Sequence, residues 1–215
     1  MIDENAVNEL VRRKVVSDTF RRLNSEKKEK LYRLALALFG KYGYDGLSVD
    51  QYCDQGKISK GSFFQYFPSK THLLEFSLLL FDSRLEDFID EIMKDESKVL
   101  AKERLKSLIQ TLTARGRLDM SEKIFYLFAA NALHHSAVTV EGINITKHVD
   151  SYIEEIVKRG TETGEIRRDY QPEITGAIVS SALHAVLIHY FLRNIQPDDA
   201  TVQTLISILF DGIRA

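Results

Sequence analysis

Apolar residues recur at the spacing of an α-helix along almost the whole chain of 215 residues. The clearest stripe occupies positions i, i+3, i+4, i+7, i+8 and i+11, which is one continuous face of a helix. Its members are Leu31, Leu34, Ala35, Leu38, Phe39 and Tyr42. No alternating run is long enough to predict a strand, and three prolines with 11 glycines are too few for the frequent turns of an all-β protein. The pattern therefore predicts an all-α fold.

Start and stop signals divide the chain into separate helices. Gly43 tolerates the left-handed conformation and ends the first long helix. Ser48 with Gln51 forms a capping-box pattern that begins a short second helix. Pro68 ends the helix that precedes it in the sequence, and Ser69 can cap the next helix. We expect helices at 26–42, 48–55 and 59–66, from residue 69 onward, and at roughly 98–115, 121–137, 144–160, 172–195 and 198–213.

Composition places the chain among globular proteins. Hydrophobic residues make up 44% and charged residues 28%, which argues against disorder. The longest unbroken apolar run, 124–130, is far shorter than a membrane span, and the N-terminal sequence has no secretory signal. The single cysteine, Cys53, excludes an intrachain disulfide and a multi-thiolate metal site. We therefore expect a soluble cytoplasmic protein without membrane association.

Charge is unevenly distributed between the two ends of the sequence. Residues 1–70 hold 13 Lys and Arg against 9 Asp and Glu, whereas residues 71–215 hold 16 against 22. A mildly basic segment on an acidic remainder is typical of a DNA-contacting head on a body that does not bind DNA. Solvated helix faces would give the same excess, so charge alone leaves both interpretations open.

The second and third predicted helices have the spacing of a helix-turn-helix, in which the second helix of the pair enters the major groove. Phe63 and Phe67, four residues apart, would face the core. Polar and small residues then remain for DNA on the other side: Ser59, Lys60, Gly61, Ser62, Gln65 and Tyr66. Gln pairs with adenine and Lys with guanine acceptors. The alternative is a solvated helix pair inside a larger bundle.

Residues 31–74 closely resemble the DNA-binding domain of the TetR family of bacterial transcriptional regulators. The matching segments are L-A-L-A-L-F-G-K-Y-G-Y-D-G-L-S-V at 34–49 and I-S-K-G-S-F-F-Q-Y-F-P-S-K at 58–70, followed by Leu73 and Leu74. A weaker similarity, G-T-E-T-G-E-I-R-R-D-Y-Q-P-E at 160–173, precedes the dimerisation helices in that family. The resemblance implies a homodimer whose C-terminal domain binds a small molecule and thereby controls operator binding.

By the same resemblance, Ser48 would lie near a DNA phosphate. Residues Ser59, Lys60, Gly61, Ser62, Gln65 and Tyr66 would meet base edges or backbone, and Lys70 would hold a phosphate. The chain departs from the family pattern at Lys57, where a non-glycine residue would adopt positive φ, and at Phe64, which replaces a frequent Tyr. Gly56 and Cys53 stand where alanine is usual, and we expect Cys53 in the core.

These features divide the chain into an N-terminal extension at 1–25, a DNA-binding domain at 26–70 and a ligand-binding and dimerisation domain at 71–215. The extension holds Arg12, Arg13, Lys14, Arg21 and Arg22, and its apolar residues can pack a short helix. One interpretation is an arm that adds phosphate or minor-groove contacts. The other is a solvated helix whose charge is offset by neighbouring acidic residues.

The segment 121–137 is apolar on nearly all sides, as expected for a central helix. With neighbouring helices it can line a cavity for an apolar or amphipathic ligand, or its aromatic residues can simply fill the core. The candidate ligand-binding residues are Phe81, Leu112, Phe125, Phe128, His134, Tyr152 and His184. The histidines form no HExxH pattern and have no cysteine cluster beside them, so we expect no metal site and no cofactor.

Small residues along 172–195 would let another helix approach closely, and 198–213 carries a second apolar stripe. Together these helices can form a twofold interface, although intramolecular packing would use the same surfaces. We expect a ligand-responsive regulator, a repressor, that binds a pseudo-palindromic DNA operator as a homodimer and is released by a largely apolar effector. The alternatives are an all-α small-molecule-binding protein or enzyme with a vestigial helix-turn-helix, and a constitutive DNA-binding protein without an effector.

Overall fold

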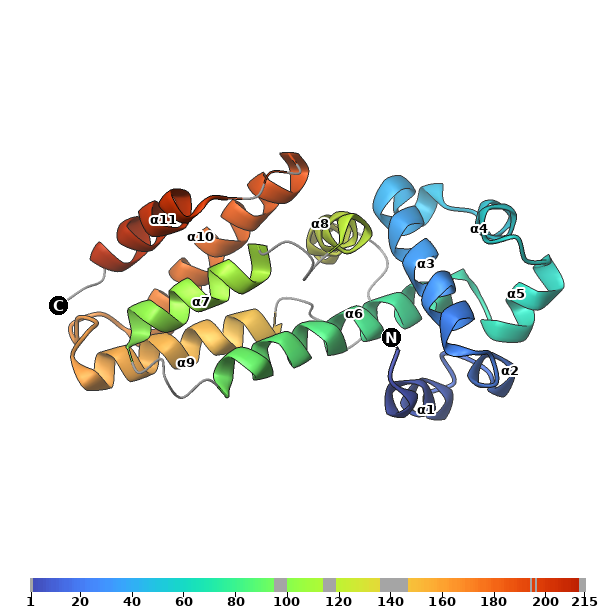
Figure 1. Ribbon diagram of the computed structural model, residues 1–215, viewed down its shortest axis with the longest axis horizontal. Coiled ribbons are helices and arrows are strands. Elements are labelled where there is room, and N and C mark those ends of the chain that lie inside the picture. Colours follow the sequence, from blue (N-terminus) through green and yellow to red (C-terminus); the bar gives the residue numbers. More distant parts are fainter. Residues whose placement is uncertain are drawn as a thin grey trace. The chain divides into compact units, whose positions relative to one another are not determined.

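In the computed structural model, every regular element of the described residues is an α-helix (Figure 1). The structure describes residues 2–94, 100–113, 119–135, 147–193, 195 and 197–212. The helices are α1 (Glu4–Arg12), α2 (Asp18–Arg21), α3 (Ser25–Gly46), α4 (Val49–Gly56), α5 (Lys60–Tyr66), α6 (Lys70–Met93), α7 (Ala101–Thr113), α8 (Met120–His135), α9 (Lys147–Thr163), α10 (Pro172–Arg193) and α11 (Asp199–Asp211). The prediction of an all-α fold is confirmed, and two short helices precede the first long one.

The chain packs as two compact units. The first unit comprises Met1–Arg84 and Met120–Ile145, and the second comprises Leu85–Asp119 and Thr146–Ala215. Helix α8 therefore groups with the N-terminal helices. These units are defined by packing; the functional boundaries at 1–25, 26–70 and 71–215 remain a proposal.

Helix α3 is the centre of the first unit and packs along α8. The two helices approach closely at Gly40, where an added Cβ would stand 2.4 Å from Cγ2 of Ile124. Nearby rings fill the space between them: Phe39 stacks on Phe128 at 6.1 Å between centroids. The expected stop at Gly43 is also found, because this residue adopts φ 69° and breaks the helical path of α3.

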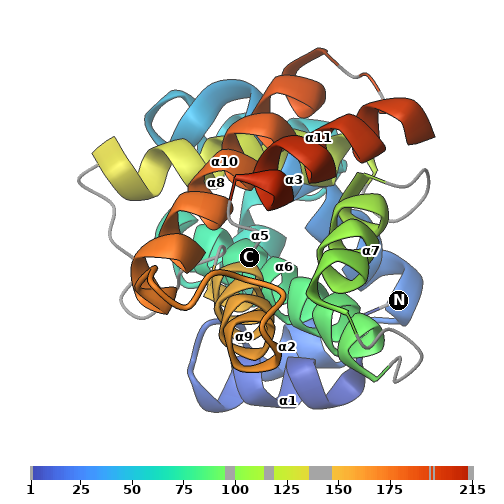
Figure 2. The ribbon, with the colours of Figure 1, turned by 90° about the vertical axis from the view of Figure 1, so that its left-hand side faces the viewer.

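The second unit is built from α7, α9, α10 and α11, with α10 beside α9 and α11 beside α7 (Figure 2). Gly160 allows the end of α9 to meet the start of α7: an added Cβ would be 2.7 Å from Ile166 Cδ1 and 3.0 Å from Ala101 Cβ. Glu165 completes this junction, since its carboxylate accepts the Ala101 N–H at 3.0 Å. The start of α7 is thereby capped from outside the helix.

Helix α10 is apolar on two faces. Val179, Leu183 and Leu187 are buried, whereas Ile174 and Ile178 on the other side are 54% and 63% exposed. By length and composition α10 could cross a membrane, with a window of mean hydropathy 1.5, but one such helix is weak evidence because core helices of globular proteins pass the same test. A second apolar face on a packed helix instead indicates a further contact surface.

Candidate nucleic-acid interface

Helices α4 and α5 form a helix-turn-helix whose first helix begins with a reciprocal cap. The Ser48 hydroxyl accepts the Gln51 N–H at 3.1 Å, and the Gln51 side chain accepts the Ser48 N–H at 2.8 Å. This is the predicted capping box, and it fixes where α4 begins. Ser48 is exposed, and both its N–H and its hydroxyl are engaged in this cap.

The turn between the two helices relies on a lysine in a left-handed conformation. Lys57 adopts φ 53° and ψ 46°, as the sequence led us to expect at this position. Its N–H bonds to the Asp54 carbonyl at 3.3 Å, and the Ile58 N–H bonds to the Cys53 carbonyl at 3.1 Å. These bonds close the end of α4. Cys53 is buried, in agreement with the expected core position.

Helix α5 separates a buried aromatic face from an exposed polar one. Phe63 and Phe67 are fully buried, with ring centroids 5.6 Å apart. The remaining candidates lie on the other faces: Ser59, Lys60, Gly61 and Gln65 are exposed, and Ser62 and Tyr66 are half-buried. Ser59 caps the helix by accepting the Ser62 N–H at 2.9 Å. Five of the predicted contact residues thus lie on one short helix, and the sixth, Ser59, is its cap.

Two features of this surface were not predicted from the sequence. Lys60 forms an ion pair with Asp50 of α4 at 2.8 Å, and a hydrogen bond with that carboxylate raises the pKa of Lys60. The ion pair holds the Lys60 ammonium against α4. Lys60 must therefore release Asp50 before it can contact DNA. Phe64 is 52% exposed beside the polar residues, a large apolar side chain on the face that would enter the groove.

Lys70 is engaged with the protein backbone. Its ammonium donates to the carbonyls of Tyr44 and Leu47 at 2.7 and 2.9 Å and lies 4.2 Å from the centroid of the Tyr44 ring. The Tyr44 hydroxyl also bonds to Thr71 at 2.7 Å. Lys70 therefore fastens the segment after Gly43 to the start of α6, and a phosphate contact remains a proposal that uses its third proton.

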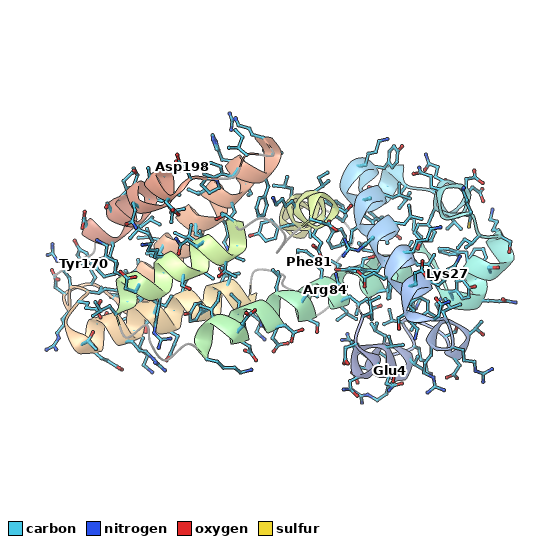
Figure 3. All side chains as sticks on the ribbon, viewed as in Figure 1. Glu4, Lys27, Phe81, Arg84, Tyr170 and Asp198 are labelled. Carbon is cyan, nitrogen blue, oxygen red and sulfur yellow. The ribbon has the colours of Figure 1, made fainter. Side chains whose placement is uncertain are left out.

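The predicted effector residues fall into both units. Phe81, which Figure 3 labels, lies in the first unit with Phe125 and Phe128. The ring centroids of Phe81 and Phe125 are 5.5 Å apart, and those of Phe125 and Phe128 are 5.8 Å apart. Leu112, Tyr152 and His184 are in the second unit, with Leu112 and Tyr152 buried. The side chain of His134 lies outside the described residues.

His184 on α10 has a partner that sequence reasoning missed. Its Nε2 lies 3.0 Å from Oδ1 of Asp150 on α9, and the Ser180 hydroxyl donates to the same oxygen. Because the carboxylate and the ring come from different helices, sequence spacing carried no signal for this pair. The cluster is a polar contact between α9 and α10.

Comparison with known proteins assigns these helices to a family. Residues 31–75 match the model of "Bacterial regulatory proteins, tetR family", a range that includes α4, α5 and the first turn of α6. The chain belongs to the TetR family of transcriptional regulators. The resemblance drawn from the motifs at 34–49 and 58–70 is thereby confirmed.

Relatives of this TetR-family chain differ in how much of it they cover. The HTH-type transcriptional repressor DhaR of Mycobacterium sp. (strain GP1) is 26% identical over 193 residues, which cover 86% of this chain and 91% of DhaR. The HTH-type regulator YuxN of Bacillus subtilis (strain 168) is 47% identical over 49 residues, or 23% of this chain and 17% of YuxN. The strong local identity fits a DNA-binding head shared between regulators.

The fold of the TetR-family chain is also found in solved structures. FadR of Bacillus subtilis in complex with stearoyl-CoA superposes with a TM-score of 0.66 at 20% identity, covering 86% of this chain and 99% of FadR. This similarity establishes the fold. The chain is a DNA-binding transcriptional regulator of the TetR family, a family that is not enzymatic.

Proposed function

We propose that the chain is a ligand-responsive repressor, located in the cytoplasm, that binds a pseudo-palindromic operator as a homodimer and is released by a small, largely apolar effector. The observation that carries the proposal is α5 itself. Its buried Phe63 and Phe67 fix the helix on the unit, while Lys60, Gly61 and Gln65 are exposed on its outer side. This is the arrangement that direct readout in the major groove requires.

A homodimer is supported by the apolar surface of α10 and α11. Ile174, Ile178 and Ile208 are 54%, 63% and 69% exposed. With Leu209 and Tyr170 they border a hollow of about 580 Å³ between the two helices. Contiguous exposed apolar surface of this kind marks an association site, and a twofold interface would apply the same patch from both subunits.

An apolar effector is supported by the aromatic lining that the candidates provide. Phe81 and Phe125 offer rings without polar atoms, and the related fold of FadR was solved with stearoyl-CoA. We propose a largely apolar effector, with its apolar part against these rings.

The first experiment is fluorescence anisotropy on DNA from upstream of the gene and on a random duplex, at several salt concentrations. We expect a preference of at least about 10³-fold with a steep salt dependence. Equal, weak binding to both duplexes would reject the assignment of that region as operator and would argue against sequence-specific repression there. Adding acyl-CoA thioesters of increasing chain length, with free CoA as control, tests release and thermal stabilisation.

The dimer is tested by Ile178→Glu, which places a charge in the centre of the apolar patch. Sedimentation at micromolar concentration should give a dimer for the wild-type protein and a monomer for the variant. Gln203→Glu, at an exposed polar position of α11, is the matched control. A wild-type monomer would contradict the proposed interface.

A further inference from the structure

The N-terminal extension is folded onto the helix-turn-helix. Helix α1 begins at an Asp3 cap and buries Val7 and Leu10, and the connection to α2 buries Val15 and Val16. Helix α2 packs against α5, so the segment before α3 lies beside the end of the proposed recognition helix (Figure 1). A short helix was expected here; its attachment to α5 was not.

The end of α5 needs hydrogen-bond donors from elsewhere. The helix has seven residues, and the proline at 68 has no N–H to offer to its last carbonyl groups. Ser17 supplies two donors: its N–H bonds to the Tyr66 carbonyl at 3.1 Å, and its hydroxyl donates to the Gln65 carbonyl. A residue 48 positions away in sequence therefore caps the end of α5.

Ser17 is itself held in place by the helix it begins. Its hydroxyl oxygen accepts the Phe20 N–H at 3.2 Å, which starts α2. The Phe20 ring is fully buried, 5.3 Å from the Phe67 ring and 5.1 Å from the Phe76 ring. The aromatic contact fixes α2 at the junction of α5 and α6, and the cap follows from that placement.

The charges of the extension are mostly compensated within the protein. Arg12 pairs with Glu9 at 2.7 Å, Arg21 with Asp18 at 2.7 Å, and Arg13 lies 3.7 Å from Glu75 of α6. An arm that binds DNA electrostatically would instead present a surplus of cations. The contacts favour a role in fixing α5 over a role as a charged arm.

We infer that Ser17 is a positioning residue for DNA readout: by capping the Gln65 and Tyr66 carbonyls, it fixes the direction in which those two side chains meet the bases. The inference rests on the proposed function. Loss of the hydroxyl that caps the Gln65 carbonyl lets the last turn of α5 fray, which reduces binding to the specific site because the base contacts lose their geometry. Contacts to phosphate, which any duplex offers, are retained.

The test compares Ser17→Ala with Ser17→Thr, which keeps the hydroxyl, and with Asn24→Ala. The last variant removes a comparable cap, at the start of α3, where Asn24 accepts the Lys27 N–H at 2.8 Å. Affinity is measured on the selected operator and on a random duplex. We expect Ser17→Ala to lower the ratio of specific to random affinity by about tenfold with an unchanged salt slope. Ser17→Thr should restore the ratio, and Asn24→Ala should leave it unchanged.

Hydrogen exchange of the same variants, without DNA, separates this inference from the proposed function. Ser17→Ala should speed exchange of α5 amides relative to those of α4, and Ser17→Thr should not. Unchanged exchange in α5, or an unchanged affinity ratio, would overturn the positioning role. If the wild-type protein prefers no duplex, the proposed function fails, and exchange in α5 still decides whether Ser17 holds the helix.

Discussion

The Arg84 side chain on α6 donates hydrogen bonds from Nη2 to both carboxylate oxygens of Glu29 on α3, at 2.9 and 2.8 Å. Its Nη1 reaches Glu122 on α8 at 3.0 Å, and its guanidinium lies 4.6 Å from the centroid of the Tyr32 ring. The side chains of Arg84, Glu29 and Glu122 are only 21%, 17% and 6% exposed. One cation therefore joins three helices of the first unit.

Arg84→Met should strongly destabilise the protein, because it leaves two largely buried carboxylates without their common partner. We expect a loss of about 2–4 kcal/mol in the free energy of unfolding, measured by urea denaturation. Arg33→Gln is the matched control, since Arg33 pairs with the same Glu29 at 2.9 Å but is 48% exposed. That variant should lose less than about 1 kcal/mol. Equal losses would contradict a special role for Arg84.

The same cluster predicts a pH dependence of stability. Burial alone raises the pKa of Glu29, but hydrogen bonds and charge from Arg84 outweigh it, and the pKa ends below its ordinary value of 4.5. The unfolded chain therefore binds the proton more readily, and stability from ionised Glu29 is present above about pH 4.5 and lost as pH falls through the lower folded pKa. The stability difference between wild type and Glu29→Gln should shrink over that interval. A constant difference from pH 6 to pH 3 would refute this.

Lys57→Gly should stabilise the helix-turn-helix. The left-handed conformation costs an L-residue about 1–2 kcal/mol, and glycine adopts it freely at the expense of a more flexible unfolded chain. We expect a net gain of about 0.5–1 kcal/mol by thermal denaturation. Lys57→Ala keeps the positive φ and should show no gain, which distinguishes backbone strain from loss of the charge.

Two buried tyrosines should respond differently to loss of their hydroxyl groups. The Tyr52 hydroxyl donates to the Leu31 carbonyl at 2.9 Å, whereas the Tyr32 hydroxyl has no hydrogen-bond partner among the described residues. Tyr52→Phe should cost about 1–2 kcal/mol, and Tyr32→Phe should be neutral or stabilising, by up to about 1 kcal/mol. The comparison is made by urea denaturation, and a reversed order would contradict the assigned partners.

Gln65→Ala should weaken binding to the specific operator by about 1–3 kcal/mol and relax sequence preference at the contacted base. Lys70→Ala should weaken binding to all duplexes about equally, and because Lys70 also holds the Tyr44 and Leu47 carbonyls, it should lower the melting temperature as well. Gln203→Ala, at an exposed position of α11, is the control. Equal losses for Gln65→Ala on specific and random DNA would remove Gln65 from the readout.

Local signals made the helices and the helix-turn-helix geometry predictable. The cap at Ser48, the stop at Gly43 and the strained turn at Lys57 each depend on residues a few positions apart, and the buried pair Phe63 and Phe67 follows from helical spacing. Contacts between distant segments were not predictable. Ser17 donates hydrogen bonds to backbone carbonyls, which every residue carries. The sequence around Ser17 therefore gives no indication of which residues it contacts.

The partners of charged residues were equally unpredictable from the sequence. Arg84 is one of several charged residues on α6, and only packing of α3 and α8 against α6 selects Glu29 and Glu122 as its partners. Lys70 was expected to bind a phosphate from the family resemblance. The carbonyls of Tyr44 and Leu47 that it contacts are backbone groups, which no sequence pattern marks. Such partners emerge from the three-dimensional fold.

The close approach of Gly40 and Ile124 links two sequence positions 84 residues apart, because no side chain fits at 40 while isoleucine occupies 124. In descendants that keep the packing of α3 on α8, alanine at position 40 requires a residue without the Cγ2 branch at 124 and a small shift of the backbone there. We therefore expect substitutions at positions 40 and 124 to occur together. A homologue with a larger residue at position 40 and isoleucine at position 124 would indicate that α8 packs differently on α3.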